Sequence, residues 1–350
     1  MSGDGSVGTG GTRTVQASLG ESRSRTGQVQ AVPSRRLWGA FLDSRRLPLI
    51  GFLLLLSAYF GLTNRYFFTL GNLTTVLSQV SVLGILAVGE TFVILLSGID
   101  LSVGSILAIS GVLSATLALH HVPVVLAMLS GVVIGLVIGL FNGFFSYAWG
   151  MASFIVTLAM LSLAGGLALV ITNGSTVFGF PNSFNYLGSA TFAGIPVSVF
   201  ILVGAFVVGH LVLKYTVFGR TVYAVGGNPN AAKLSGINVT AVGIKVFMIS
   251  GGLAGLATLI NTGRLASAIP IAGQTILLPT IAAVVIGGTS LFGGVGSLGG
   301  TFVGVLLIGV LNNGLAISNV SAFWDQAVQG VVIFVAVAID ALAQRRTART

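Results

Sequence analysis

The chain has 350 residues, of which 54% are hydrophobic and only 7% are charged, and its mean hydropathy is +1.02. So few polar side chains cannot cover a soluble globule, which excludes a soluble globular protein and indicates an integral membrane protein. The net charge of +9 does not indicate a nucleic-acid partner, because ten of the sixteen basic residues lie near the two chain ends. The absence of cysteine excludes disulfides, thiolate metal sites and a cysteine nucleophile.

The N-terminal segment, residues 1–46, is rich in Gly, Ser, Thr and Arg and has no sustained apolar period. We predict a disordered tail there. The first apolar run begins near Leu47, too late in the chain for a signal peptide. Residues 47–343 then form the membrane domain, and residues 344–350 form a short C-terminal tail.

The membrane domain divides into ten apolar segments of the length that a spanning helix needs, about 20 residues. This pattern predicts an all-α integral membrane protein. The predicted spans are 48–63, 72–96, 101–119, 123–147, 153–172, 193–213, 241–261, 276–292, 296–315 and 323–343. Clusters of Gly, Pro, Asn and Ser separate them, and the short boundaries near Asp100 and Trp149 can hide a re-entrant turn.

The distribution of Lys and Arg predicts the orientation. With ten spans and a cytoplasmic N-terminus, the N-terminal tail, the segment 214–245 and the C-terminus share one side and collect fourteen of the sixteen basic residues. Only Arg65 and Arg264 fall on the other side. We therefore predict that both termini are cytoplasmic.

A weak sequence similarity between two parts of the chain predicts an inverted repeat. The sequence "IGLFNG" (138–143) ends the fourth predicted span, and "IGVLNNG" (308–314) ends the ninth. Likewise "GIDLSVGSILAISG" (98–111) opens the third, and "ILLPTIAAVVIGG" (276–288) lies in the eighth. Partners five spans apart have opposite orientation, as in inverted-repeat transporters.

The longest polar stretch on the basic side, 214–240, contains signals for a short helix. Gly226 and Gly227 free the chain, and Asn228 can cap a helix that starts at Pro229. Gly236 suits the position just after such a helix. An ordinary surface loop helix fits these signals, and so does a helix whose small face lies in another protein's groove.

Six motifs occur in order between residues 72 and 342. They are "TFVILLSGIDLSVGS" (91–105), "GLFNGFF" (139–145), "FIVTLAMLSLAGGLAL" (154–169), "FGRTVYAVGGNPNAAKLSGINV" (218–239), "IAAVVIGGTSLFGGVGSLGGT" (281–301) and "GVLNNGL" (309–315), followed by "FW" (323–324). With these motifs the chain resembles the permease subunits of ATP-binding-cassette importers, in the ribose/xylose-type simple-sugar branch of the branched-chain amino acid/sugar permease superfamily.

The resemblance implies a type II importer permease in the cytoplasmic (inner) membrane. Such a permease works as a homodimer, receives a sugar from an extracytoplasmic solute-binding protein and is driven by a cytoplasmic ABC ATPase. Residues 226–237 match the family's coupling loop, whose helix inserts into the ATPase. The residues assigned to coupling are Gly226, Gly227, Asn228, Pro229, Ala231, Ala232, Leu234, Ser235 and Gly236.

No enzymatic chemistry is expected in this chain. The phosphate-loop pattern G-x-x-x-x-G-K-[ST] does not occur, so ATP hydrolysis needs a separate subunit. The three histidines lack neighbouring carboxylates in the sequence. We therefore assign no catalytic residue, no metal site and no cofactor.

Two departures from the family pattern bear on the cargo. Where many relatives carry two acidic residues, this chain has Leu277 and Pro279, and where many carry an arginine in the fifth span it has Gly165. The fold expectation is unaffected, but polar groups facing the external vestibule have been lost. The resemblance therefore leaves open whether the cargo is an ordinary pentose or hexose.

Asp100 has two compatible interpretations. Asp100 or Ser102 can cap the third predicted helix, with a side-chain oxygen accepting from N–H groups two or three residues on. The break can also face a water-filled pathway, where irregular backbone and charge are tolerated. The pathway candidates, several of which equally suit a purely structural role, are Glu90, Asp100, Ser102, Asn142, Phe154, Thr157, Asn312 and Asn313.

Other functions remain open at this stage. The same kind of permease can carry a branched-chain amino acid, a nucleoside or a signalling furanone. A secondary transporter driven by an ion gradient is disfavoured by the coupling loop and by the scarcity of intramembrane carboxylates, chiefly Glu90 and Asp100. A membrane enzyme is disfavoured because the sequence offers no acid–base pair.

Overall fold

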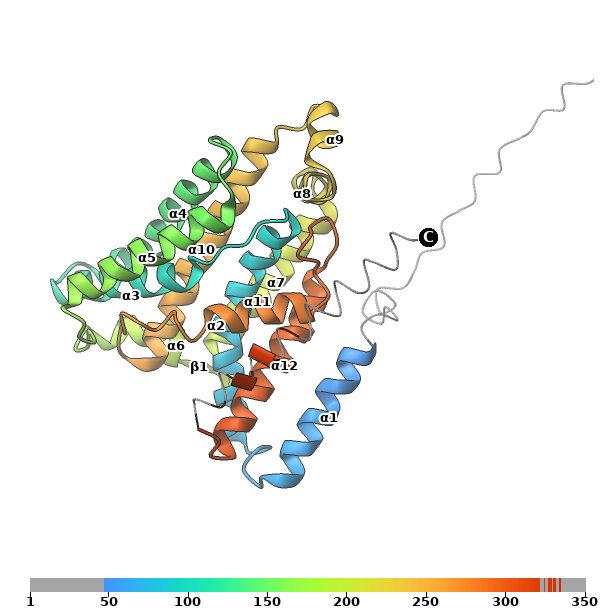
Figure 1. Cartoon of the computed structure of the whole chain (residues 1–350). Helices are drawn as coiled ribbons and strands as arrows, with labels where there is room; N and C mark the ends of the chain where they lie inside the picture. Colours follow the sequence, from blue (N-terminus) through green and yellow to red (C-terminus); the bar gives the residue numbers. More distant parts are fainter. Residues whose placement is uncertain (1–46, 322–323, 325–326, 329, 332–333, 335–350) are drawn as a thin grey trace, which may run out of the picture. The chain divides into compact units, whose positions relative to one another are not determined.

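The computed structural model describes residues 47–321, together with residues 324, 327–328, 330–331 and 334. This part of the chain is helical apart from loops and one two-residue hairpin, so the predicted all-α membrane fold is confirmed (Figure 1). The predicted tails at 1–46 and 344–350, and most of the predicted span 323–343, lie outside the described residues.

The helices follow the predicted order. They are α1 (Leu47–Thr63), α2 (Leu70–Leu95), α3 (Val103–Leu119), α4 (Val124–Tyr147), α5 (Ser153–Thr172), η2 (Asn182–Asn185), α6 (Tyr186–Ser189), α7 (Val197–Tyr215), α8 (Val217–Gly227), α9 (Pro229–Leu234), α10 (Val239–Leu265), α11 (Leu277–Ile286) and α12 (Leu298–Ile317). Strands β1 (Thr191–Phe192) and β2 (Ile195–Pro196) form the hairpin.

Six helices, α2, α4, α5, α7, α10 and α12, are long and apolar enough to cross a membrane, and α1, α3 and α11 are shorter apolar helices. Nine of the ten predicted spans therefore contain a described helix. The predicted span 193–213 begins late, at Val197, because the hairpin turn at Ala193 and Gly194 takes positive φ angles and Ile195–Pro196 are extended. The chain is a multi-pass membrane protein.

The eighth predicted span was wrong in its form. The segment 276–292 is helical only over the ten residues of α11, which rise about 15 Å, half of the hydrocarbon thickness. The segments on either side of α11 are not helical. Ala268 pairs with Val177 just beyond the end of α5, whereas the Gly294 N–H donates to the Leu95 carbonyl at the end of α2.

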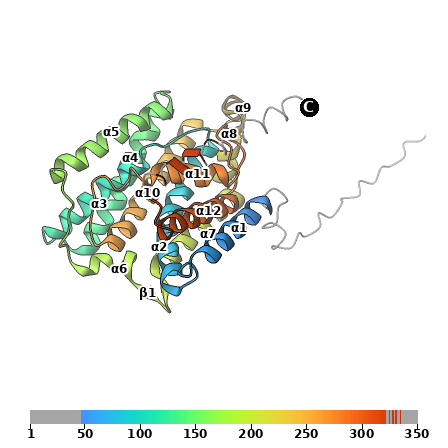
Figure 2. The ribbon, with the colours of Figure 1, turned by 60° about the horizontal axis from the view of Figure 1, so that its bottom comes forward.

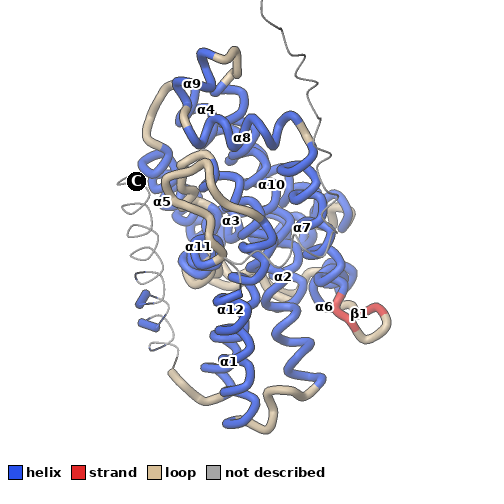
Figure 3. The backbone as a smooth tube through the Cα atoms, turned by 90° about the vertical axis from the view of Figure 1, so that its right-hand side faces the viewer, coloured by secondary structure: helices blue, strands red, loops and turns tan. Residues whose placement is uncertain are grey.

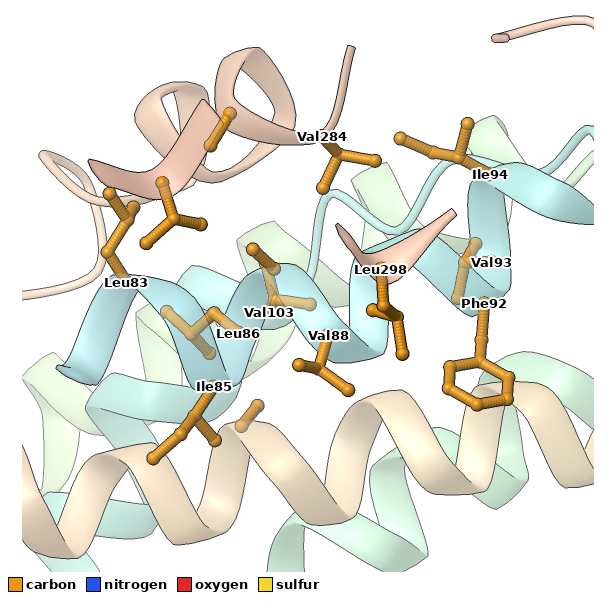
Figure 4. Close-up of a cluster of buried hydrophobic side chains, with 14 of the residues drawn as sticks. Leu83, Ile85, Leu86, Val88, Phe92, Val93, Ile94, Val103, Val284 and Leu298 are labelled. Carbon is orange, nitrogen blue, oxygen red and sulfur yellow. The ribbon is translucent and has the colours of Figure 1, made fainter. Parts of the chain in front are cut away.

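Helix α2 is the centre of the bundle. Its most apolar window is 83% buried, compared with 22% for α4 and 28% for both α5 and α7. Figure 4 shows its aliphatic side chains, among them Leu83 and Leu86, beside Val103 of α3, Val284 of α11 and Leu298 of α12. The exposed apolar faces of the outer helices suit contact with lipid, whereas α2 is buried from Val80 to Leu95.

A row of glycines allows α4 and α10 to pack at backbone contact. Gly131, Gly135, Gly139 and Gly143 recur every fourth residue of α4, and a Cβ at Gly135 would collide with the Gly251 carbonyl of α10. Small residues at this spacing are a known basis of helix association in membranes. The result is that α10 lies between α4 and α2 (Figures 1 and 2).

The membrane domain has two distinct ends. Helices α8 and α9 lie at one end, which we call the α9 end, and the α1–α2 turn lies at the other (Figure 3). Helix α10 begins at the α9 end and runs to the opposite end, antiparallel to α4. The sites below are located relative to these two ends.

Candidate translocation site and coupling surface

Asp100 lies in the non-helical segment Leu96–Ser102, which folds back from the end of α2 before α3 begins. Its Oδ1 accepts from the Ser102 backbone N–H at 3.0 Å and from the Ser102 hydroxyl at 2.6 Å, and its Oδ2 accepts from the Ser250 hydroxyl of α10 at 3.0 Å. The residue is completely buried. The carboxylate thus ties the unwound segment to α10.

The contact two residues on that the capping hypothesis predicts is present, but it closes a turn before α3, and no side chain caps the first turn of that helix. Asp100 accepts from a backbone N–H two residues on, as expected, and it is the side chain that closes the turn. Ser102 occupies the N-cap position of α3 but makes no side-chain capping bond. Its hydroxyl is engaged with Asp100, and it accepts from the Asn142 amide of α4 at 2.8 Å.

Glu90 of α2, ten residues before Asp100, also belongs to this network. Its Oε1 accepts from the Asp100 backbone N–H at 3.2 Å, and its Oε2 is buried without a hydrogen-bond partner. Glu90 and Asp100 are the only acidic residues between positions 47 and 321. We call the five residues Glu90, Asp100, Ser102, Asn142 and Ser250 the buried polar network.

The two pathway candidates of α5, Thr157 and Phe154, lie in different surroundings. The Thr157 hydroxyl donates to the Ile99 carbonyl at 3.0 Å and is buried, so it braces the unwound segment from the side of α5. Phe154, by contrast, is 50% exposed on the outer face of α5. The structure does not bring Phe154 to the network.

The two asparagines of α12, Asn312 and Asn313, also lie in different surroundings. Asn313 and Asn72 of α2 exchange reciprocal amide hydrogen bonds, each 2.9 Å long, which is the helix-bridging arrangement expected for this residue type. Asn312, one position earlier, lines a cavity. Of the eight pathway candidates, it alone does so among the cavities found in the described residues.

That cavity has a volume of about 380 Å³, and because Arg264 and Leu265 at the end of α10 line it, it lies away from the α9 end. Helices α2, α10, α11 and α12 and the segment between α10 and α11 form its wall. Its polar lining side chains are Gln79, Asn261, Arg264, Thr275 and Asn312. We call it the Arg264 cavity.

A second cavity, of about 390 Å³, lies between α3, α5 and the same connecting segment. Residues 269–276 line both cavities and thus form the partition between them. The departures named in the sequence fall on these walls: Pro279 lines the Arg264 cavity, and Gly165 lines the second one. Leu277 is buried and lines neither.

At the other end of the bundle, α9 forms as its sequence signals predict. The Asn228 side chain accepts from the Ala231 N–H, Pro229 is the first helical residue, and Gly236 follows the helix with φ of +82°. Leu234 is 91% exposed.

Two expectations about this segment were wrong. Ala232 does not belong to the exposed small face, because it is 4% exposed and packs into the main core, whereas Ala231 and Ser235 are exposed. Gly226 and Gly227 do not free the chain, because they form the last residues of α8, an amphipathic helix that the sequence reasoning missed. Its signal was present in Thr216, which caps α8 by accepting from the Gly219 N–H.

At Gly226, α8 approaches the backbone of the bundle closely. A Cβ there would collide with the Leu95 carbonyl and approach the Gly294 N–H, which already donates to that carbonyl at 2.9 Å. The Ser97 hydroxyl donates to the carbonyls of Phe292 and Gly226, at 2.6 and 3.3 Å. Ser97 has φ of +60°, which costs energy for a residue other than glycine.

We call this meeting of α8, the 96–102 segment and the 288–297 loop the junction. Tyr223 of α8 extends it, since its hydroxyl donates to the Gly296 carbonyl at 3.0 Å. Burial raises the pKa of the Tyr223 phenol, which keeps it protonated as a donor. Neither Ser97 nor Tyr223 was singled out in the sequence, because their partners are more than seventy residues away.

Comparison with known proteins places this arrangement among transport proteins. Residues 72–337 match the family described as "Branched-chain amino acid transport system / permease component". The ribose import permease protein RbsC of Bacillus subtilis is 45% identical over 84% of this chain and 91% of its own length. The RbsC protein of Escherichia coli K12 is 42% identical over 89% and 98%, and the D-allose transport system permease protein AlsC of that organism is 42% identical over 83% and 90%. No solved structure matches the chain significantly.

The matched range begins just inside α2 and contains the buried polar network, both cavities, the junction and α8–α9. The relatives are matched over at least nine tenths of their own length, so the resemblance concerns whole proteins and not a shared fragment. The chain therefore belongs to the family of permease components of branched-chain amino acid transport systems.

Proposed function

We propose that the chain is the membrane subunit of an ATP-driven importer that carries a sugar across the cytoplasmic membrane. The similarity to ribose and allose import permeases over nearly their whole length carries this proposal. The chain has no phosphate-loop motif, so the energy comes from a separate ATPase subunit. A second copy of the chain and an extracytoplasmic solute-binding protein complete the importer.

The ATPase docks on α9 in this proposal. The exposed Leu234, at 91%, supplies an apolar anchor, and the exposed Ala231 allows close approach. Large apolar anchors that fill a pocket in the partner dominate the energy of many protein interfaces. The remaining coupling residues shape the helix: Asn228 and Pro229 start it, and Gly236 ends it.

The junction carries the ATPase's movement into the bundle. Because Gly226 lies against the Leu95 carbonyl and the Gly294 N–H, a displacement of α8 acts on both the 96–102 segment and the 288–297 loop at once. The first holds Asp100, and the second joins α11 to α12, both of which line the Arg264 cavity. Movement at the α9 end can thus reach the cavity through backbone contacts.

The orientation proposed here has α9 and both termini in the cytoplasm. It follows the positive-inside distribution, in which Lys214, Arg220, Lys233 and Lys245 surround α8 and α9. Single cysteines at Ser6 and Ala348, in a chain that has none, should resist impermeant thiol reagents in intact cells. Ready labelling of either position contradicts the orientation.

An ion-gradient mechanism is not favoured by the carboxylates. Both Asp100 oxygens are engaged by serine donors, and Glu90 supports the same loop. Neither residue lines the Arg264 cavity or the second cavity.

The test is uptake by the reconstituted importer with its ATPase and binding protein, compared between two adjacent substitutions. Ala231→Trp adds bulk on the exposed face of α9, so it should leave the permease folded, weaken ATPase co-purification and abolish ATP-driven uptake. Ala232→Trp adds the same bulk to a buried position and should instead destabilise the permease itself, by about 1–3 kcal/mol. Normal ATPase binding and uptake in the Ala231→Trp variant would refute docking on α9.

A further inference from the structure

The Arg264 cavity has the size and lining of a small-molecule site. Its volume of about 380 Å³ falls in the range of roughly 300–1,000 Å³ that ligand pockets occupy. Three of its side chains, Gln79, Asn261 and Asn312, carry amides, which both donate and accept hydrogen bonds. Groups of this kind match the hydroxyls of a carbohydrate.

Arg264 is the one charged residue of this lining. One guanidinium nitrogen lies 3.5 Å from the Asn261 amide oxygen, at the limit of a hydrogen bond, and the buried Nε has no partner. Unpaired arginine nitrogens away from water are costly, so such a group calls for an acceptor. The position in the last turn of α10 offsets part of this cost through the helix dipole.

No protein carboxylate is available to supply that acceptor within the described residues. The only acidic residues between positions 47 and 321 are Glu90 and Asp100, and both belong to the buried polar network. At the cavity wall, the residue placed to face the interior from the first turn of α11 is Pro279, which has no polar side chain. The cavity therefore holds one positive charge and no negative one.

We propose that the Arg264 cavity takes the cargo on its way through the permease and that this cargo is a sugar bearing an acidic group, namely a carboxylate or a phosphate. The Nε edge of Arg264 binds the oxyanion, because a guanidinium and a carboxylate or phosphate pair through two parallel hydrogen bonds. The amides of Gln79, Asn261 and Asn312 receive the hydroxyls. This inference rests on the proposed function, which it makes more specific.

The experiment uses a single reporter cysteine in the full-length chain, which has no cysteine of its own. Thr275→Cys places the thiol on the exposed rim of the cavity. In membrane vesicles, its rate of reaction is measured with an anionic and a cationic methanethiosulfonate of similar size. The ratio of the two rates reports the charge of the cavity without requiring transport.

We expect the anionic reagent to be favoured, and the ratio of the two rates to fall about 25-fold when Arg264 is neutralised, because one nearby unit charge in water changes each rate about fivefold in opposite directions. Arg264→Gln removes the charge. Pro279→Asp keeps Arg264 and adds a compensating carboxylate in the first turn of α11, where an acidic residue suits the helix end. A His120→Cys reporter, exposed in the α3–α4 turn, controls for effects outside the cavity. An unchanged ratio in both variants overturns the proposal.

Protection of the reporter cysteine then identifies the class of sugar. D-galacturonate should slow the reaction more than D-galactose does, and the difference should vanish in Arg264→Gln and persist in part in Arg264→Lys. Stronger protection by D-galactose 6-phosphate assigns the oxyanion as a phosphate. Equal protection by the neutral sugar, or no protection by any of the three, overturns the acidic-sugar inference. ATP-driven uptake of a neutral sugar alone would leave the proposed function standing while rejecting this inference.

Discussion

The buried polar network and the Arg264 cavity both contain charged side chains within apolar segments, but they use those charges differently. Both Asp100 oxygens accept hydrogen bonds from the chain itself, and the residue is completely buried. Arg264 has one long contact and an unpartnered Nε, and it faces a cavity. A charge whose partners lie within the protein maintains the fold, whereas a charge left without them is available to a ligand.

The network also explains why the chain can unwind in the middle of the bundle. The segment 96–102 leaves backbone groups outside any helix, and in a membrane these must find partners in the protein. Asp100, Glu90 and Thr157 supply them, respectively to the N–H of Ser102, the N–H of Asp100 and the carbonyl of Ile99. Without these polar side chains, the unwound segment would leave buried backbone groups without hydrogen-bond partners.

The largest expected effect is that of Asp100→Leu. The substitution leaves the Ser102 N–H, the Ser102 hydroxyl and the Ser250 hydroxyl without their acceptor, at about 1–3 kcal/mol for each buried group. We expect the detergent-solubilised permease to lose most of its thermal stability and its monodisperse elution. Asp100→Asn keeps one acceptor oxygen and places an amide donor opposite Ser250, so it should assemble nearly normally.

Comparing these two variants separates shape from charge. Assembly lost equally in Asp100→Asn and Asp100→Leu would mean that the negative charge itself is required. If Asp100→Asn assembles but loses uptake, Asp100 would be a residue that contacts the cargo, as proposed for Arg264.

The next effect is expected at the junction, which connects the network with α9. In Gly226→Ala, the new Cβ meets the Leu95 carbonyl, and relief of that contact costs about 1–3 kcal/mol, or roughly a fivefold to hundredfold loss of uptake if it falls on the coupling step. ATPase co-purification should persist, because α9 is unchanged. Gly227→Ala is the matched control, since a Cβ there meets nothing within 4 Å. Equal uptake in the two variants would rule out transmission through the junction.

Local sequence signals predicted the elements of this molecule better than its sites. Neighbouring residues signal nine apolar segments, the helix start at Asn228–Pro229 and the helix end at Gly236. The structure contains all of them. The shortness of α11 had a local signal that the predicted span passed over, because Gly287 and Gly288 end its apolar run at Ile286, inside the expected span.

The sites depend on contacts between distant residues, which a single sequence does not encode locally. Asp100 and Glu90 stood out because charge is rare in the membrane domain, but their partner Ser250 is 150 residues from Asp100. Arg264 was counted only for topology, although it is the charged residue of the cavity whose wall also contains Pro279. The burial of Ala232 likewise depends on packing into the main core that its own helix does not reveal. The predicted inverted repeat stays a prediction.

A smaller effect within the network is expected at Glu90. Glu90→Ala removes the acceptor for the buried Asp100 N–H, which should lower the free energy of unfolding by about 1–2 kcal/mol. Glu90→Gln keeps an acceptor oxygen for that N–H and should be close to wild type in thermal unfolding. If both variants unfold like wild type, the Glu90 contact to the Asp100 N–H does not stabilise the fold. The carboxylate at this position would then be explained by its unpartnered Oε2.

The smallest effect on stability is expected at Arg264, and this contrast with Asp100 is the sharpest form of the comparison. Arg264→Gln removes a side chain that makes one contact of 3.5 Å, so the loss should be limited to the helix-end charge, about 0.5 kcal/mol. The thermal unfolding midpoint should therefore stay within experimental scatter while the advantage of the acidic sugar in protecting the cavity is lost. The amide introduced by this substitution can still form a hydrogen bond with Asn261, and it preserves most of the side-chain length at the cavity wall. A fall in stability comparable with that of Asp100→Leu would show that the guanidinium supports the fold, and the distinction between the two regions would fail.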